Sequence, residues 1–162
     1  MDLSVTDEYV TPRPVMTRAY LVELIRAARL RKGLRWVDVA AAVGLSKEWV
    51  TAACLGQMAM DDREARVVCE LFELPADAVA ILRTAPYRGS LPTAVPTDPL
   101  VYRFYELVSV YGTALKELID EEFGDGIMSA VDFSMNIERE PSATGDRVRI
   151  TMSGKFLPYK RY

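Results

Sequence analysis

Three polar residues in the last third of the chain have types and a spacing that could do chemistry. Arg103 and Glu106 are one helical turn apart, and Ser129 follows at the start of a predicted strand. The chain has no histidine, so any catalysis must proceed without an imidazole. Arginine supplies charge and forked donors, serine one more donor, and glutamate can orient the arginine. This set suits a small planar or linear anion.

Ordinary structural roles are the alternative for the same three residues. An arginine and a glutamate at this spacing usually form a solvated ion pair of little energetic consequence. However, Arg103 lies among three aromatic residues in YRFY, which predicts a partly dry setting. Ser129 has the parity of Val131 and Phe133, so its hydroxyl is expected on an apolar strand face, where it needs a partner. These two features favour a site.

A long helix and a small β-hairpin must position these side chains. The apolar spacing predicts a helix over 100–123, ended by Gly124 and Gly126. Alternation then predicts a strand over 127–138, a turn at PSATGD and a second strand at RVRITMS. The closing KFLPYKRY could add one more short strand. So few elements cannot bury an apolar strand face alone, and we therefore predict an obligate oligomer held through the C-terminal third.

The first half of the chain is predicted to be helical. Ala40, Gly44, Leu45 and Val50 have the spacing of a helix-turn-helix, with Leu45 and Val50 expected in its core. The expected helices begin near Thr17 and end at Gly33, and then cover 36–43, 46–55, 61–72 and 76–82.

This motif is a weak signal for DNA binding. The first turn of its second helix offers Lys47, Glu48 and Thr51, and no arginine, asparagine or glutamine that could read base edges. Residues 1–90 contain equal numbers of basic and acidic side chains, so the basic excess of a nucleic-acid binder is missing. A packing role for the motif is favoured.

These patterns predict an α+β fold in four parts. A flexible N-terminal tail covers 1–16, and a helical bundle with the helix-turn-helix-like motif covers 17–85. A proline-rich linker covers 86–99, and a catalytic and oligomerisation domain covers 100–162. We expect the hairpin of this last domain to intertwine in a dimer.

The two cysteines and the overall composition exclude several classes of function. Cys54 and Cys69 lie in apolar, helix-like sequence and are predicted to be buried free thiols. Without histidine, a metal site is not expected, and we predict no cofactor. The sequence shows no apolar run of membrane-spanning length and no targeting segment, so we expect a cytoplasmic protein without membrane partners.

The chain resembles the cyanase (cyanate hydratase) family. YRFYE, VYGTALKEL, FGDGIMSA and GKFLPYK carry the resemblance, which is strong over 98–160 and looser over 17–90. It implies that Arg103, Glu106 and Ser129 are catalytic in a bicarbonate-dependent decomposition of cyanate to carbamate, ammonia and carbon dioxide. It also implies a homodecamer of five dimers, with sites built from several chains, no cofactor, and a helix-turn-helix-like domain that does not bind DNA.

Two other functions are compatible with parts of the sequence. A small helix-turn-helix transcription regulator would use the C-terminal part as a dimerising ligand sensor, but it would need a basic recognition face that the charge distribution lacks. A purely structural interaction protein would leave Ser129 on an apolar face without a reason. The enzyme is therefore the leading hypothesis.

Overall fold

The computed structural model describes residues 15–89 and 94–160 of the chain. The predicted N-terminal tail lies outside the described residues except at its last two positions, as do four residues of the predicted linker. The chain divides into two compact units between Arg88 and Gly89, and each is described by itself. Among the described helices, none is long and apolar enough to cross a membrane.

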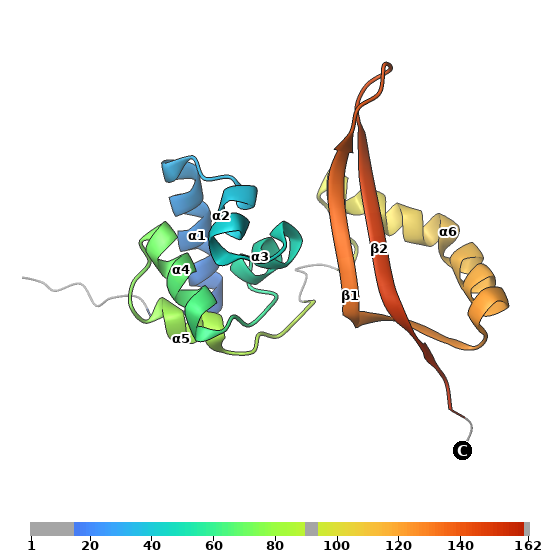
Figure 1. The fold of residues 1–162 in the computed structure, drawn as a ribbon, viewed down its shortest axis with the longest axis horizontal. Helices are drawn as coiled ribbons and strands as arrows, with labels where there is room; N and C mark the ends of the chain where they lie inside the picture. Colours follow the sequence, from blue (N-terminus) through green and yellow to red (C-terminus); the bar gives the residue numbers. More distant parts are fainter. Residues whose placement is uncertain (1–14, 90–93, 161–162) are drawn as a thin grey trace, which may run out of the picture. The chain divides into compact units, whose positions relative to one another are not determined.

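Over residues 15–88, the first unit is a bundle of five helices (Figure 1). They confirm the predicted helices, although the last one begins two residues later than expected. The helices are α1 (Arg18–Lys32), α2 (Trp36–Val43), α3 (Lys47–Cys54), α4 (Asp62–Phe72) and α5 (Ala78–Arg83).

Local capping explains where these helices begin and end. The hydroxyl of Ser46 accepts the amide of Trp49 at 3.2 Å at the start of α3. At the start of α4, Asp61 and Glu64 form a reciprocal capping box with bonds of 2.7 and 2.8 Å. Gly44 ends α2 with φ at 87°, a left-handed conformation that glycine adopts without a steric penalty.

The apolar faces of the five helices meet in one core. Its largest fully buried side chains are Phe72, Leu21, Ile25 and Leu82. Within the helix-turn-helix-like pair, Val50 is buried as expected, but Leu45 is 42% exposed. The expectation for Leu45 is wrong because this residue lies in the turn between α2 and α3, before the Ser46 cap, where it projects away from the packed faces.

An arginine joins the two ends of this bundle. The guanidinium of Arg18, in the first turn of α1, donates to the backbone carbonyls of Ile81 and Thr84 at the end of α5. A cation suits this position because the last carbonyls of a helix are unpaired and carry partial negative charge. The first and last helices of the unit are thereby held together.

The described residues of the second unit form one long helix and a two-stranded antiparallel sheet (Figure 1). Helix α6 spans Pro99–Phe123, and strands β1 and β2 span Gly126–Glu140 and Arg147–Pro158. The carboxylate of Asp98 caps α6 by accepting the amides of Leu100 and Val101 at 2.9 and 3.0 Å. The idea of a further short strand after the second is wrong, because residues 155–158 continue β2 without a break.

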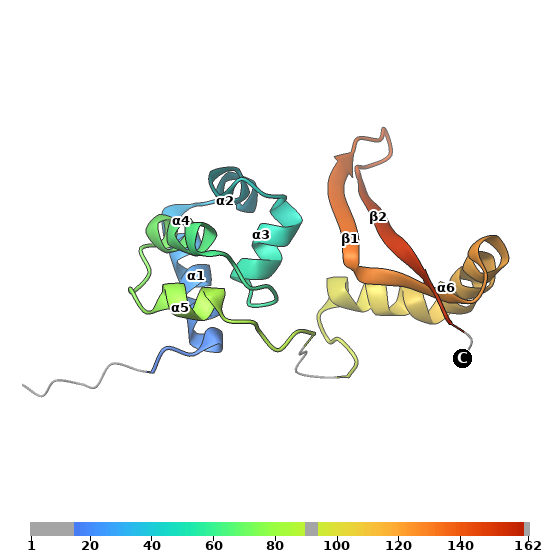
Figure 2. The same cartoon turned by 60° about the horizontal axis from the view of Figure 1, so that its bottom comes forward.

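The pairing of β1 with β2 contains a large irregularity. Met128 pairs with Phe156, but the next pair is Phe133 with Gly154. Residues 129–132 of β1 therefore stand opposite Lys155 alone. Bulges of this kind bend the strand that carries the extra residues. Figure 2 shows such a sharp bend in the early part of β1.

The two units differ greatly in how much apolar surface they bury. Every buried apolar residue among those described belongs to the first unit. In the described part of the second unit, the one buried residue is Ser129, and the long helix α6 buries none of its side chains. Large apolar residues on α6 are exposed to solvent in the single chain; Val108 is 61% and Leu118 is 64% exposed. The α+β fold is thus confirmed, but the second unit, as far as the structure describes it, has no buried apolar core of its own.

Candidate functional site

Arg103 and Glu106 form an ion pair on α6. Arg103 Nη1 lies 2.8 Å from Glu106 Oε2, and the two side chains are 64% and 47% exposed. The guanidinium carbon of Arg103 also lies 5.4 Å from the ring centre of Tyr102. In the single chain the pair is not in the partly dry setting that the aromatic neighbours predict. Any drier environment has to come from another surface.

Ser129 is in the opposite situation, because it is buried and already hydrogen-bonded. Only 6% of the surface of Ser129 is exposed. Its Oγ accepts the backbone amide of Asp132 at 2.9 Å and that of Val131 at 3.1 Å. A serine hydroxyl has two acceptor lone pairs and one hydrogen to donate. With both lone pairs used, the hydroxyl can serve a further group only as a donor.

The bulge also changes the strand face on which Ser129 lies. Strict alternation predicts that Ser129 shares a face with Val131, yet Ser129 is buried and Val131 is 96% exposed. The prediction is wrong because alternation requires regular pairing, and the register shifts between Met128 and Phe133. Ser129 therefore lies in the bulge of β1 with its side chain buried.

The second unit brings together two of the three predicted site residues. Arg103 and Glu106 contact each other directly on α6. Among the described residues, no hydrogen bond or ion pair joins Ser129 to either of them. The three side chains thus form two groups, a cation and carboxylate on the helix and a hydroxyl on the strand.

Sequence reasoning missed the groups that hold Ser129. They are the amides of Val131 and Asp132, and Gly154 on the opposite strand. A Cβ built on Gly154 would lie 2.3 Å from the carbonyl oxygen of Ser129, which is far inside van der Waals contact. A glycine in the interior of a strand often marks a bulge or a close approach of two backbones. That signal was present in RITMSGKFLP.

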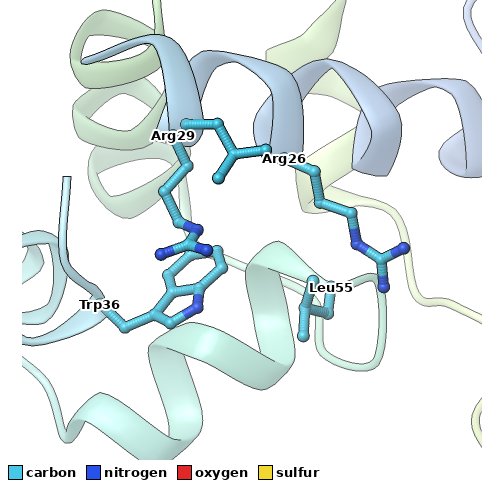
Figure 3. Close-up of a pocket in the computed structure, with 5 residues that line it drawn as sticks. Arg26, Arg29, Trp36 and Leu55 are labelled. Carbon is cyan, nitrogen blue, oxygen red and sulfur yellow. The ribbon is translucent and has the colours of Figure 1, made fainter. Parts of the chain in front are cut away.

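A shallow pocket lies in the first unit and does not include any of the three predicted residues. It has a volume of about 260 Å³ and is lined by Arg26, Arg29, Leu30, Trp36 and Leu55. Figure 3 shows Arg29 stacked against the Trp36 ring, with 5.2 Å between guanidinium carbon and ring centre, while Arg26 points away from both. Arg29 also donates to the carbonyl of Leu34 at 3.3 Å, so it is committed to closing the turn after α1.

The two cysteines have different environments. Cys54 is buried, as predicted, and burial raises the pKa of its thiol to about 12. Cys69 is only partly buried, so the expectation of a buried thiol is met for one residue and not fully for the other. A thiol with its pKa near 12 stays protonated at neutral pH and is a poor nucleophile.

Both units match families of known proteins. Residues 18–86 match the family described as "Cyanate hydratase, N-terminal", and residues 93–161 match the "Cyanate lyase C-terminal domain". Curated proteins named cyanate hydratase from Methylibium petroleiphilum and Cupriavidus necator are each 64% identical over 147 residues. These matches cover 91% of this chain and the whole of each relative.

The chain belongs to the cyanate hydratase family. Among solved structures, the crystal structure of cyanase from T. urticae matches with a TM-score of 0.75 at 36% identity. That match covers 85% of this chain and 96% of the other. The helix-turn-helix-like unit is part of this family, because it is the segment that matches the N-terminal domain of cyanate hydratases. The transcription-regulator hypothesis is therefore not supported.

Proposed function

We propose that this chain is a cyanate hydratase that decomposes cyanate with bicarbonate as co-substrate, and that Arg103, Glu106 and Ser129 form its catalytic site. The observation that carries the proposal is the hydrogen bonding of Ser129. Because its Oγ already accepts two amides, the hydroxyl is restricted to donating. A donor-only hydroxyl and an arginine recognise anions, and cyanate and bicarbonate are both anions.

The reaction itself requires the assembly and breakdown of an anionic adduct. An oxygen of bicarbonate attacks the cyanate carbon, and the nitrogen takes up one proton from bicarbonate and one from solvent. The adduct then breaks the bond between the bridging oxygen and the bicarbonate carbon, which releases carbon dioxide and leaves carbamate. Carbamate takes up a proton and separates into ammonia and a second carbon dioxide. No redox or cofactor step is needed for this balance.

Each of the three side chains has a distinct role in this scheme. Arg103 binds the two substrate anions and their adduct through its forked donors. Glu106, 2.8 Å from Arg103, orients the guanidinium and balances its charge. Ser129 donates to the negative charge that develops in the adduct. The transition state gains the most from a donor that is fixed in place before the reaction begins.

The same proposal includes assembly into a homodecamer of five dimers, with each site completed by several chains. The exposed apolar surface of α6 and the lack of buried apolar residues in the described part of the second unit support association. In the dimer, the β1–β2 hairpin intertwines with its copy. Covering α6 with other chains would supply the drier setting that Arg103 and Glu106 lack in the single chain.

The direct test is ammonia release by the purified full-length protein. Ammonia should form from cyanate only when bicarbonate is supplied, and Arg103→Ala, Glu106→Leu and Ser129→Ala should abolish it. Ser134→Ala is the matched control for Ser129, because Ser134 is an exposed serine of β1 in the regular part of the ladder. Wild-type protein that releases no ammonia would refute the activity. Full activity in all three site variants would refute the site alone.

A further inference from the structure

The backbone at Ser129 packs closely against Gly154, and this contact is possible because glycine has no side chain. Gly154 of β2 faces the bulge, and a Cβ there would lie 2.3 Å from the Ser129 carbonyl oxygen and 2.6 Å from Met128 Cγ. No ordinary side chain tolerates the first of these distances. The two backbones can approach this closely because position 154 is glycine.

This close approach occurs at the bulge in β1. Gly154 pairs with Phe133, the first regular partner after the bulge, while the carbonyl of Ser129 comes from the other end of the bulge. The four bulge residues are therefore in contact with Gly154 of β2 at one end, through the Ser129 carbonyl, and are followed at the other end by the regular pair of Phe133 with Gly154. Their compact path brings the amides of Val131 and Asp132 back onto the Ser129 Oγ.

We propose that Gly154 is a positioning residue for the Ser129 hydroxyl, which it keeps as a fixed, donor-only group. The inference rests on the proposed role of Ser129 in catalysis. A methyl group at position 154 would push the Ser129 carbonyl away and shift the Cβ and Oγ attached to the same residue. One or both hydrogen bonds from the backbone amides to the Ser129 Oγ would then lengthen. The hydroxyl would be free to rotate, and could accept as well as donate.

The chain contains a matched control for this effect. A Cβ on Gly126, at the start of β1, would lie 2.5 Å from the Leu157 carbonyl oxygen and 2.5 Å from Phe156 Cζ. Gly126→Ala therefore crowds the same hairpin to a similar degree, but its nearest contacts are with Leu157 and Phe156 and not with Ser129. A merely structural role for Gly154 predicts that the two variants behave alike.

The main experiment compares kcat and KM for cyanate in Gly154→Ala and Gly126→Ala, at saturating bicarbonate and per mole of assembled protein. For Gly154→Ala we expect kcat to fall by roughly 100-fold, as for a catalytic group misplaced by about 1 Å. KM should change much less, because Arg103 still binds the substrates. Gly126→Ala should lose stability but keep most of kcat. Equal losses of kcat in the two variants, or a wild-type kcat in Gly154→Ala, would overturn the proposal.

A double variant separates the two contacts at position 154. Met128 has a flexible side chain that can move aside, whereas the Ser129 carbonyl belongs to the backbone. Met128→Ala should therefore fail to restore kcat when it is combined with Gly154→Ala. Restoration would show that only side-chain crowding matters, and would overturn the role assigned to the carbonyl contact.

A third pair of variants decides the question if Gly154→Ala does not fold. Val131→Pro removes one of the two amides that hold Ser129, whereas Val131→Ala keeps it and trims a side chain that is 96% exposed. We expect kcat of Val131→Pro to fall well below that of Val131→Ala. Equal kcat values would overturn the proposal. If Ser129→Ala is itself as active as wild type, the site assignment fails first, which is a separate outcome.

Discussion

Arg103 and Glu106 are joined by a 2.8 Å ion pair on a helix that buries none of its own side chains. The pair is the kind that contributes little to stability when it lies in water. Its geometry is nevertheless that of an oriented guanidinium, with one nitrogen held by the carboxylate and the others available to a ligand. In the site proposed above, the pair therefore serves binding of the anions rather than stability.

Replacing the fork of Arg103 by a single ammonium should impair catalysis although the charge is kept. For Arg103→Lys we expect kcat/KM to fall by about 10- to 100-fold, the equivalent of one or two lost charge-assisted hydrogen bonds. The control is Arg66→Lys, which changes an exposed arginine 2.7 Å from Asp62 in the first unit. Steady-state ammonia release measures both. Equal activity of the two variants would show that the fork of Arg103 has no special role.

A charge on the open face of α6 should prevent assembly. Val108→Glu places a carboxylate on a side chain that is 61% exposed in the single chain, and that we expect to be covered in the oligomer. Sedimentation velocity should show smaller species than for wild type. Leu30→Glu is the control, because Leu30 is 74% exposed in the first unit and should leave the oligomer intact. An unchanged oligomer in Val108→Glu would argue against an interface there.

Two aliphatic residues of the first unit should differ sharply in their effect on stability. Ile25 is fully buried, so Ile25→Ala should cost about 2–5 kcal/mol of unfolding free energy through lost burial and a new cavity. Leu45→Ala should cost far less, because its side chain is 42% exposed. Chemical denaturation followed by the fluorescence of the two tryptophans measures both changes. Similar costs would mean that Leu45 is covered in the assembled protein.

High pH should weaken the first unit through Cys54. Burial raises the pKa of this thiol from 9.0 to about 12, so the folded chain keeps a proton that the unfolded chain loses. The stability that depends on a protonated Cys54 thiol is therefore fully present below about pH 9, and it is lost as the pH rises toward about 12. Denaturation midpoints measured from pH 8 to pH 11 should fall less steeply for Cys54→Ala than for wild type. Cys69→Ala is the control and should remain closer to wild type.

Helix positions in the first unit could be predicted from the sequence because their signals are local. Ser46 and Asp61 are capping residues followed by apolar periodicity, and both caps occur in the structure. The exposure of Leu45 does not follow from the sequence, because a turn residue between two helices has no periodicity of its own. Its exposure depends on the angle at which the helices meet, which only the folded structure supplies.

The three residues of the proposed site stand out in the sequence, but their local geometry could not be predicted from it. The types and spacing of Arg103, Glu106 and Ser129 are written in the sequence, and the ion pair follows from helical spacing alone. The bulge at Ser129 depends on a register between strands that are distant in sequence, and the apolar alternation continues through it without a visible break. Gly154 was the one local sign of irregular pairing.

The uneven distribution of buried apolar residues has a consequence for how the protein is made. The residues that form the core of the first unit all lie between Leu21 and Leu82. During synthesis, this core can close while the β-hairpin is still inside the ribosome, because domains generally fold as units from the N-terminus onward. The second unit emerges after the first with the apolar side chains of α6 exposed, and in the proposed assembly these side chains are covered only when other chains bind. Folding of the first unit should thus be independent of protein concentration, whereas maturation of the second unit in the proposed assembly should depend on how many copies are being made nearby.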